Sequence, residues 1–212
     1  MRKMTLLTLS TTLTLVGAAL ATLSAAVVFT ATYKSIDAGA VSFAGKKVAA
    51  LVISKDDSLR MAGEESLARE LSARGMQAVA TYRMAPKEEL QSAETARPWF
   101  ERANVEGIVA LRPVIVESRQ AYTAGTWVNP NYSTLWGYYG YGWGSVYVIG
   151  TVPKQTRVTI ETTIYSVSRN QLLWAAVTEA TSSGDLREFV DDLAKEMVKE
   201  MQKQGLAKGQ PR

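Results

Sequence analysis

The amino-acid sequence predicts a single α/β domain of the α+β kind, with a mixed five-stranded sheet, about three helices and the order β-α-β-α-β-β-β-α. Residues 48–53 are a short, continuous apolar run, as in strands that are buried on both faces. Residues 158–165 alternate apolar and polar side chains, as in a strand with one face toward water. About 180 residues remain after the N-terminal segment, which fits one domain with a sizeable core, here residues 46–206.

The first strand is followed by a predicted helix and a second strand. Asp56 and Asp57 can cap the helix, because their carboxylates accept hydrogen bonds from the free N–H groups of a first turn. Gly75 ends this helix, since glycine readily adopts the left-handed conformation of a C-terminal stop. Residues 77–82 then form the second strand, which completes a strand-helix-strand unit.

A second unit of the same kind is predicted to follow. Pro86 suits the first turn of a helix, which Pro98 must kink or restart. The third strand begins at residues 108–111, and Pro113 places a bulge there or pushes the strand to an edge before it resumes at 114–116. Two consecutive units of this kind favour parallel pairing of their strands.

The second half of the domain is predicted to be a hairpin and a helix. Residues 158–165 pair with residues 172–177 across a turn at 168–170, and a hairpin is necessarily antiparallel. Asp185 begins the last helix, whose apolar stripe packs on the sheet, and Gly205 ends it. The sheet is therefore expected to be mixed.

The N-terminus is predicted to be a targeting segment. Arg2 and Lys3 precede an uncharged run over residues 4–33, with small residues toward its end. Residues 1–25 therefore fit a secretory signal peptide, with cleavage suited to the position before Thr22. The run is long for a signal, so an uncleaved N-terminal membrane anchor is the alternative.

Three further boundaries follow from this segment. Leu23-Ser24-Ala25-Ala26 is similar to a lipobox, with alanine where the lipidated cysteine stands in lipoproteins. Residues 26–45 are expected to be a linker, and residues 207–212 a flexible tail. Both the cleaved and the anchored alternative place the domain outside the cytoplasm, in the periplasm or the cell envelope.

Composition excludes several classes of function. The chain has no histidine and no cysteine, so it lacks the commonest general base, the commonest metal ligand and any thiolate nucleophile. The formal charge of +4 includes Arg2 and Lys3, so a cleaved form carries 4 − 2 = +2. A nearly neutral body with no basic stripe gives no support to nucleic-acid binding. No enzymatic activity, no metal and no cofactor are expected.

The unusual segment is residues 121–147, where aromatic residues alternate with glycines. Because closely spaced glycines disfavour helix and strand, we expect a loop. Tyr and Trp present an apolar face with a polar tip, which suits sugar rings, peptides or a membrane interface. Alternatively, the rings fold back and cover the open face of the sheet. The candidate binding residues are Trp127, Tyr132, Trp136, Tyr138, Tyr139, Tyr141 and Trp143.

Other motifs give weaker indications. The glycines within residues 137–142 follow no predicted strand, which argues against a phosphate-binding loop. Asp56 and Asp57 could bind a cation or act in hydrolysis, but helix capping explains them more simply. Three glutamates lie in strand-like segments and are the remaining carboxylates of interest: Glu117, Glu161 and Glu179.

Four segments carry a resemblance to known proteins: residues 43–48, 63–65, 137–143 and 199–206. With these, the chain resembles uncharacterised bacterial cell-envelope lipoproteins over nearly all of the domain. The order of elements is similar to the N-terminal α/β domain of the Tol system's periplasmic protein and to outer-membrane activators of cell-wall synthases. The resemblance implies a function in binding other envelope proteins, and Ala26 departs from the lipid-anchored pattern.

The sequence thus predicts an exported envelope binding or assembly module without catalytic activity. Its partner is expected to be an envelope protein or cell-wall component, contacted through the aromatic segment, with membrane association through the N-terminus as a further possibility. The alternative is a protein that binds or hydrolyses an envelope glycan and uses the aromatic segment as a sugar platform.

Overall fold

The computed structural model describes residues 27–114, 122–146, 157–181 and 184–207. Its strands are β1 (Val27–Lys34), β2 (Lys47–Val52), β3 (Gln77–Ala80), β4 (Gly107–Val114), β5 (Arg157–Ser166) and β6 (Gln171–Thr181). Its α-helices are α1 (Asp57–Ser72), α2 (Ala93–Arg102), α3 (Ala124–Val128), α4 (Pro130–Ser133), α5 (Leu135–Gly144) and α6 (Leu186–Lys203). Three short 3-10 helices are η1 (Ile36–Ala40), η2 (Thr81–Arg83) and η3 (Glu88–Leu90).

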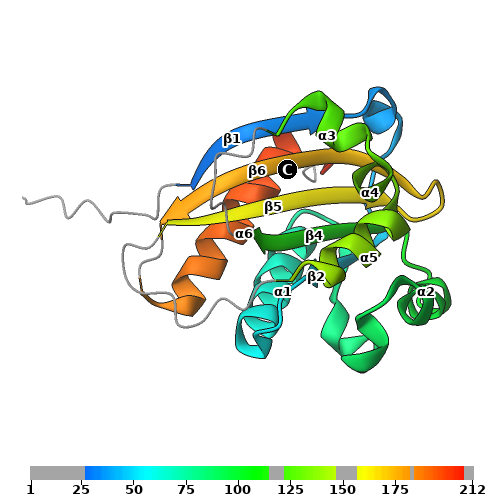
Figure 1. Cartoon of the computed structure of the whole chain (residues 1–212), viewed down its shortest axis with the longest axis horizontal. Helices are drawn as coiled ribbons and strands as arrows, with labels where there is room; N and C mark the ends of the chain where they lie inside the picture. Colours follow the sequence, from blue (N-terminus) through cyan, green and yellow to red (C-terminus); the bar gives the residue numbers. More distant parts are fainter. Residues whose placement is uncertain (1–26, 115–121, 147–156, 182–183, 208–212) are drawn as a thin grey trace, which may run out of the picture.

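The strands form one mixed sheet in the order β1-β6-β5-β4-β2-β3 (Figure 1). β2 pairs in parallel with both β3 and β4, as the two strand-helix-strand units predicted. β4, β5, β6 and β1 pair antiparallel in that order, which confirms the predicted hairpin and the mixed sheet. The bulge or edge strand predicted at Pro113 is wrong, because β4 lies inside the sheet and its register with β5 continues through Pro113. The sheet tolerates this proline because the pairing of β4 with β2 already ends at Leu111.

Helices cover both faces of the sheet. α1 and α6 pack on one face, and α2 and α3–α5 cover the other, as Figure 1 shows for α3, α4 and α5 in front of the strands. The apolar run of β2 explains its place between these layers, because Val48, Ala50 and Val52 face one core and Ala49 and Leu51 face the other. The prediction of a strand buried on both faces is confirmed.

The prediction of a linker over residues 26–45 is wrong for residues 27–34, which form the strand β1. The sheet therefore has six strands where five were predicted. Alternate side chains of β1 are half-buried, including Val27 and Phe29, while the residues between them face outward. This period of two is concealed in the sequence by the uncharged run that precedes it. The predicted signal peptide or anchor at 1–25 lies outside the described residues. Of the tail predicted at 207–212, Ala207 instead packs into the core, and residues 208–212 lie outside the described residues.

The aromatic segment was predicted to be a loop, and this is wrong, because it forms α3, α4 and α5. Side-chain caps start two of these helices: the Asn129 carboxamide oxygen accepts from the Asn131 N–H at 2.9 Å, and the Thr134 hydroxyl accepts from the Gly137 N–H at 3.2 Å. Glycine also permits close packing here, since a Cβ on Gly142 would lie 2.8 Å from Ile53. Tertiary packing therefore outweighs the low helix propensity of glycine.

The same helices change the surroundings of β5, for which one face was predicted to be exposed to water. Glu161, Thr163 and Tyr165 on that face are fully buried, so the prediction is wrong. The reason is that α4 and α5 lie over this face and replace water with tyrosine hydroxyls. No helix within the described residues is both long enough and apolar enough to cross a bilayer.

Candidate binding site

The structure divides the seven aromatic candidates into two groups. Trp127, Tyr132, Tyr138 and Tyr139 are buried, with at most 8% of each residue exposed, and they belong to the core on this face of the sheet. The other three are half-buried and reach the surface: Trp136, Tyr141 and Trp143. The interpretation of the segment as a cover for the sheet therefore holds for the first group, and a binding surface can involve only the second.

A buried ion pair connects the sheet to this cover. The Arg112 guanidinium on β4 donates from Nε and Nη2 to the two carboxylate oxygens of Glu161 on β5, at 3.0 Å each. The hydroxyls of Tyr132 and Tyr138 donate to the same carboxylate at 3.0 and 2.9 Å. Arg112 also donates to the Ser145 hydroxyl at 2.9 Å, directly after α5. The Glu161 carboxylate of β5 is thus satisfied by Arg112 of β4 and by hydroxyls that α4 and α5 supply.

The charges in this network are fixed by their surroundings. Burial tends to lower the pKa of Arg112, but its interactions with Tyr138 and Glu161 outweigh that effect and raise the pKa above the ordinary value. Burial, followed by the nearby Glu161 charge, raises the pKa of Tyr132 and of Tyr138. Tyr132 and Tyr138 consequently stay neutral and donate to the Glu161 carboxylate beside the Arg112 cation, which suits a structural role.

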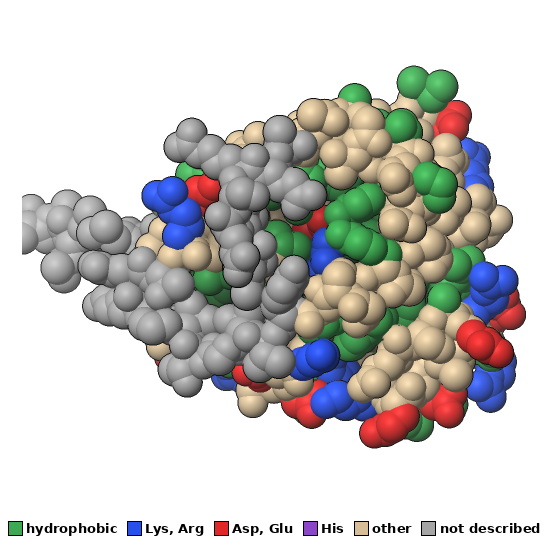
Figure 2. Space-filling model, in the orientation of Figure 1, with side chains coloured by type: hydrophobic (Ala, Val, Ile, Leu, Met, Phe, Trp, Pro, Cys, Tyr) green, Lys and Arg blue, Asp and Glu red, His purple; other side chains and the backbone are tan. Residues whose placement is uncertain are grey.

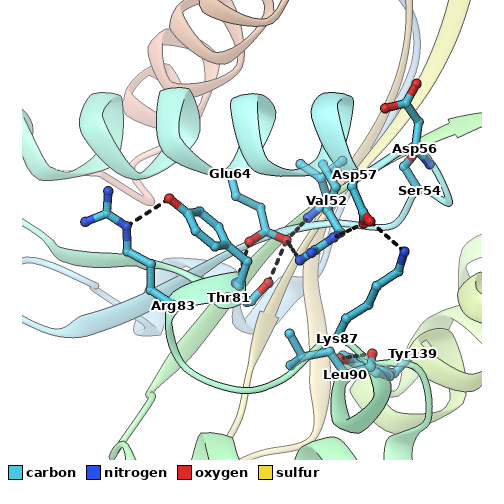
Figure 3. Close-up of polar contacts among 12 residues, drawn as sticks. Val52, Ser54, Asp56, Asp57, Glu64, Thr81, Arg83, Lys87, Leu90 and Tyr139 are labelled. Carbon is cyan, nitrogen blue, oxygen red and sulfur yellow. Dashed lines mark hydrogen bonds and ion pairs between the residues drawn. The ribbon is translucent and has the colours of Figure 1, made fainter.

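A second buried carboxylate lies where the parallel strands end. Glu64 of α1 is fully buried and accepts hydrogen bonds from the Val52 N–H at 3.3 Å, the Thr81 hydroxyl at 2.7 Å and the Tyr82 N–H at 2.7 Å (Figure 3). Burial raises the pKa of the Glu64 carboxyl, while these hydrogen bonds and the charge of Arg60 act in the opposite direction. Glu64 therefore ties α1 to the ends of β2 and β3.

A chain of charges leads from Glu64 to the surface. Arg60 Nη1 lies 3.8 Å from Glu64, and Arg60 Nε donates to Asp57 at 3.4 Å. The Lys87 ammonium donates to the other Asp57 oxygen at 2.8 Å, and this hydrogen bond is the main cause of the lowered pKa of Asp57 (Figure 3). Asp56 caps α1 by accepting from the Leu59 N–H at 3.0 Å, so the capping interpretation of Asp56 is confirmed.

Lys87, at the far end of this chain of charges from Glu64, lines a pocket of about 350 Å³. Its lining comes from three distant segments: Lys55 after β2, Lys87 and Gln91 around η3, and Trp143 on α5. In open α/β sheets, ligands commonly bind beyond the carboxyl ends of the parallel strands, which is where Lys55 lies. The volume lies in the range of about 300–1,000 Å³ typical of small-molecule pockets.

Trp143 differs from the other half-buried tryptophans. Trp99 lies under the Arg102 guanidinium at 4.3 Å, and Trp136 lies under Arg97 at 4.7 Å. Within the described residues, Trp143 has no ring or guanidinium partner, and its buried indole N–H lies near the Tyr139 hydroxyl without reaching full hydrogen-bond geometry. Trp143 packs in part against the core on this face of the sheet, and the rest of its side chain lines the pocket.

The other surface features are less specific. On the face shown in Figure 2, hydrophobic side chains are exposed in the middle, and charged side chains gather along the lower and right-hand margins. The described residues contain no group of three or more acidic side chains placed to hold a metal ion. Of the three glutamates, Glu117 lies outside the described residues, Glu161 is bound by Arg112, and Glu179 pairs with Arg157 at 3.2 Å on the surface.

Sequence reasoning identified Trp143 but not the other lining residues. Lys55, Lys87 and Gln91 form no motif, because 36 positions separate Lys55 from Gln91 and a further 52 separate Gln91 from Trp143. The available signal was the position of Lys55 directly after a buried parallel strand.

Comparisons with known proteins show similarity at the level of structure only. No family model matches the chain, and no curated protein matches it. A PelC dodecamer from Paraburkholderia phytofirmans is 14% identical, with 84% of this chain and 97% of that chain covered and a TM-score of 0.46. A point variant of the same protein is 14% identical, with 84% and 98% covered and a TM-score of 0.45. At this level, similarity assigns neither partner nor activity, and the resemblance to envelope lipoproteins and to the Tol domain stays a prediction.

Proposed function

We propose that the protein is an exported, non-catalytic binding module of the cell envelope, and that it contacts its partner at the pocket formed by Trp143, Lys55, Lys87 and Gln91. The observation that carries this proposal is the position of Trp143 at the wall of that pocket, without a ring or guanidinium partner among the described residues. Tryptophan is enriched at binding sites because it offers a large apolar surface at low cost in conformational entropy.

The engagement of the buried carboxylates supports a binding function over hydrolysis. Glu161 is neutralised by Arg112, and Glu64 accepts from two backbone N–H groups. Glycoside hydrolysis commonly needs two carboxyl groups on opposite sides of a substrate, about 5–10 Å apart. Both of these carboxylates instead hold elements of the fold together. Glycan binding, without hydrolysis, stays compatible with the pocket.

Export and location in the envelope are supported by the N-terminal sequence pattern alone. Residues 1–25 combine a positive start with an uncharged run, which is typical of a targeting segment.

The test compares two tryptophans in an envelope-retention assay. Purified wild-type protein is mixed with washed envelope fragments, and the fraction that sediments with them is measured. Trp143→Ala is expected to lower this fraction at least about tenfold, the loss associated with a binding anchor. Trp99→Ala, which removes a half-buried tryptophan under Arg102, is the matched control and is expected to bind normally. Equal retention of wild type and Trp143→Ala would contradict the proposed site.

A further inference from the structure

The chemistry of the pocket wall indicates a class of ligand. Both charged side chains that line it, Lys55 and Lys87, are cationic. The Lys87 ammonium already donates a hydrogen bond to Asp57, whereas the Lys55 ammonium has no hydrogen-bond or ion-pair partner among the described residues. The side-chain amide of Gln91 is likewise without a partner in the described part of the chain. The pocket thus combines an apolar ring, a neutral amide and at least one uncompensated positive charge.

Building on the proposed function, we propose that the pocket binds an acidic saccharide, with a sugar ring on Trp143, hydroxyls at Gln91 and the carboxylate or other acidic group at Lys55. The C–H face of a sugar ring is apolar and fits the flat face of an indole. An amide both donates and accepts, so Gln91 can bind two hydroxyls at once. An ammonium binds an anionic group by a charge-assisted hydrogen bond, which is stronger than a neutral one.

The position of Lys87 sharpens this assignment. Its ammonium donates to Asp57 at 2.8 Å, and Asp57 is also held by Arg60. Lys87 is therefore a fixed and partly neutralised wall of the pocket, while Lys55, exposed on the loop after β2, is the cation that can turn toward a ligand. Of the two lysines, Lys55 is accordingly expected to determine the preference for acidic over neutral sugars.

A phosphate-rich ligand such as a nucleic acid fits the pocket less well. Nucleic-acid sites combine several basic residues along a groove with bases stacked on aromatic rings. Here a single tryptophan and two lysines line a compact pocket, and no arginine, the usual bidentate ligand of phosphate, is among the lining residues. A short oligonucleotide therefore serves as the competing ligand in the test.

The test measures binding of defined probes by calorimetry, using the purified protein. The probes are trigalacturonate, which carries three carboxylates, neutral maltotriose and a thymidine trinucleotide. Trigalacturonate is expected to bind at least about tenfold more tightly than maltotriose, the ratio that one charge-assisted hydrogen bond supplies. Binding of the trinucleotide that is as tight as that of trigalacturonate would overturn the assignment to saccharides.

Three variants locate the interaction. Lys55→Gln is expected to reduce trigalacturonate binding to the level of maltotriose, and Trp143→Ala is expected to abolish binding of both sugars. Lys195→Gln, at an exposed lysine on α6 across the sheet, is the matched charge control and is expected to bind like wild type. An equal loss in Lys55→Gln and Lys195→Gln would show non-specific attraction and overturn the proposal. Because Lys55 is exposed, its variant tests the ligand even if Trp143→Ala does not fold.

The failure of this inference can be told apart from failure of the proposed function. If trigalacturonate does not bind but Trp143→Ala loses retention on envelope fragments, the binding module stands and its ligand is not an acidic saccharide. If the Trp143→Ala variant still sediments with envelope fragments like wild type, and Lys55→Gln leaves trigalacturonate binding unchanged, both proposals are wrong.

Discussion

Arg112 on β4 and Glu161 on β5 form a bidentate ion pair beneath α4 and α5, with Arg112 Nε and Nη2 each 3.0 Å from the carboxylate oxygen that it contacts. The pair is almost fully buried, and Tyr132 and Tyr138 complete the coordination of the carboxylate. A buried charge that loses its partner is costly, because neither water nor another ion replaces it. This relationship makes the seating of the aromatic helices dependent on two residues of the sheet.

Arg112→Ala is therefore expected to lower the free energy of unfolding by about 3–5 kcal/mol, as the loss of one member of a buried ion pair does. Chemical denaturation measures this change. Arg157→Ala, which removes the exposed partner of Glu179, is the matched control and is expected to cost less than about 1 kcal/mol. Similar values for the two variants would show that the Arg112 pair is not shielded from water.

Trp136 and Trp143 are expected to respond differently to truncation. Trp136 packs edge-on against Phe100 and lies under Arg97, so Trp136→Ala is expected to cost about 2 kcal/mol, less than the roughly 3–5 kcal/mol of a fully buried tryptophan. Trp143 has no such ring partner among the described residues, and Trp143→Ala is expected to cost about 1 kcal/mol or less. Thermal melts of the two single variants check this order, and a lower melting temperature for Trp143→Ala would place that ring in the core.

Leu193→Ala tests how α6 packs on the sheet. Leu193 is 4% exposed and belongs to the core on that face, so its truncation is expected to cost about 2–5 kcal/mol. Lys195→Ala, two positions further along the same helix and exposed, is expected to change stability by less than about 0.5 kcal/mol. Denaturant midpoints compare the two. A loss of unfolding free energy below about 0.5 kcal/mol for Leu193→Ala would mean that this face of α6 does not contribute to the core.

Glu64 is expected to make stability depend on pH. Its pKa in the folded protein is raised above the ordinary value of 4.5, mainly by burial. Between the two values, the folded state binds the proton more tightly than the unfolded chain does, so this contribution to stability falls as pH rises through the window above 4.5. Glu64→Gln removes the titrating group and is expected to flatten this part of the curve.

The Glu64 experiment compares unfolding free energies at several pH values for wild type and variant. Glu64→Gln is also expected to be less stable by about 1–3 kcal/mol, because an amide nitrogen cannot accept from a backbone N–H. Glu65→Gln, at the half-buried neighbouring position that pairs with Arg83, keeps the Glu64 carboxyl and serves as the control. A wild-type stability that rises through the same window, with no change in Glu64→Gln, would refute the role of Glu64.

Cleavage of the N-terminal segment is expected between Thr22 and Val27, since β1 begins at Val27 and must remain for the sheet to be complete. N-terminal sequencing of the mature protein checks the position. Protein recovered from membranes with Met1 intact would instead support the uncleaved anchor.

Much of the fold was predictable because its signals are local. The apolar run of β2, the cap at Asp56, the cap at Asp185 and the turn at 168–170 each depend on neighbouring residues, and all appear in the structure as expected. These signals also determined the mixed pairing, because a strand-helix-strand unit and a hairpin each impose one direction on their strands.

The helices of the aromatic segment were not predictable from local preference. Their glycines disfavour helix when considered alone, and the reason for them lies elsewhere in the chain. Glycine at position 142 is explained by Ile53, which leaves no room for a side chain there, and the burial of Tyr138 is explained by its hydrogen bond to Glu161. The pocket was hidden for the same reason, because Lys55 and Trp143 meet only after β2 and α5 have been placed.

The position of β1 has a consequence for the order in which the chain can fold. β1 is the first of the described elements to emerge during synthesis, yet its partner is β6, and the Thr30 hydroxyl donates to the Val177 carbonyl across 147 positions. Contacts over such distances form late, because a long loop must close before they can be made. The leading strand therefore stays without its partner until nearly the whole domain has been synthesised, so the sheet cannot be completed before the C-terminal part of the chain is present.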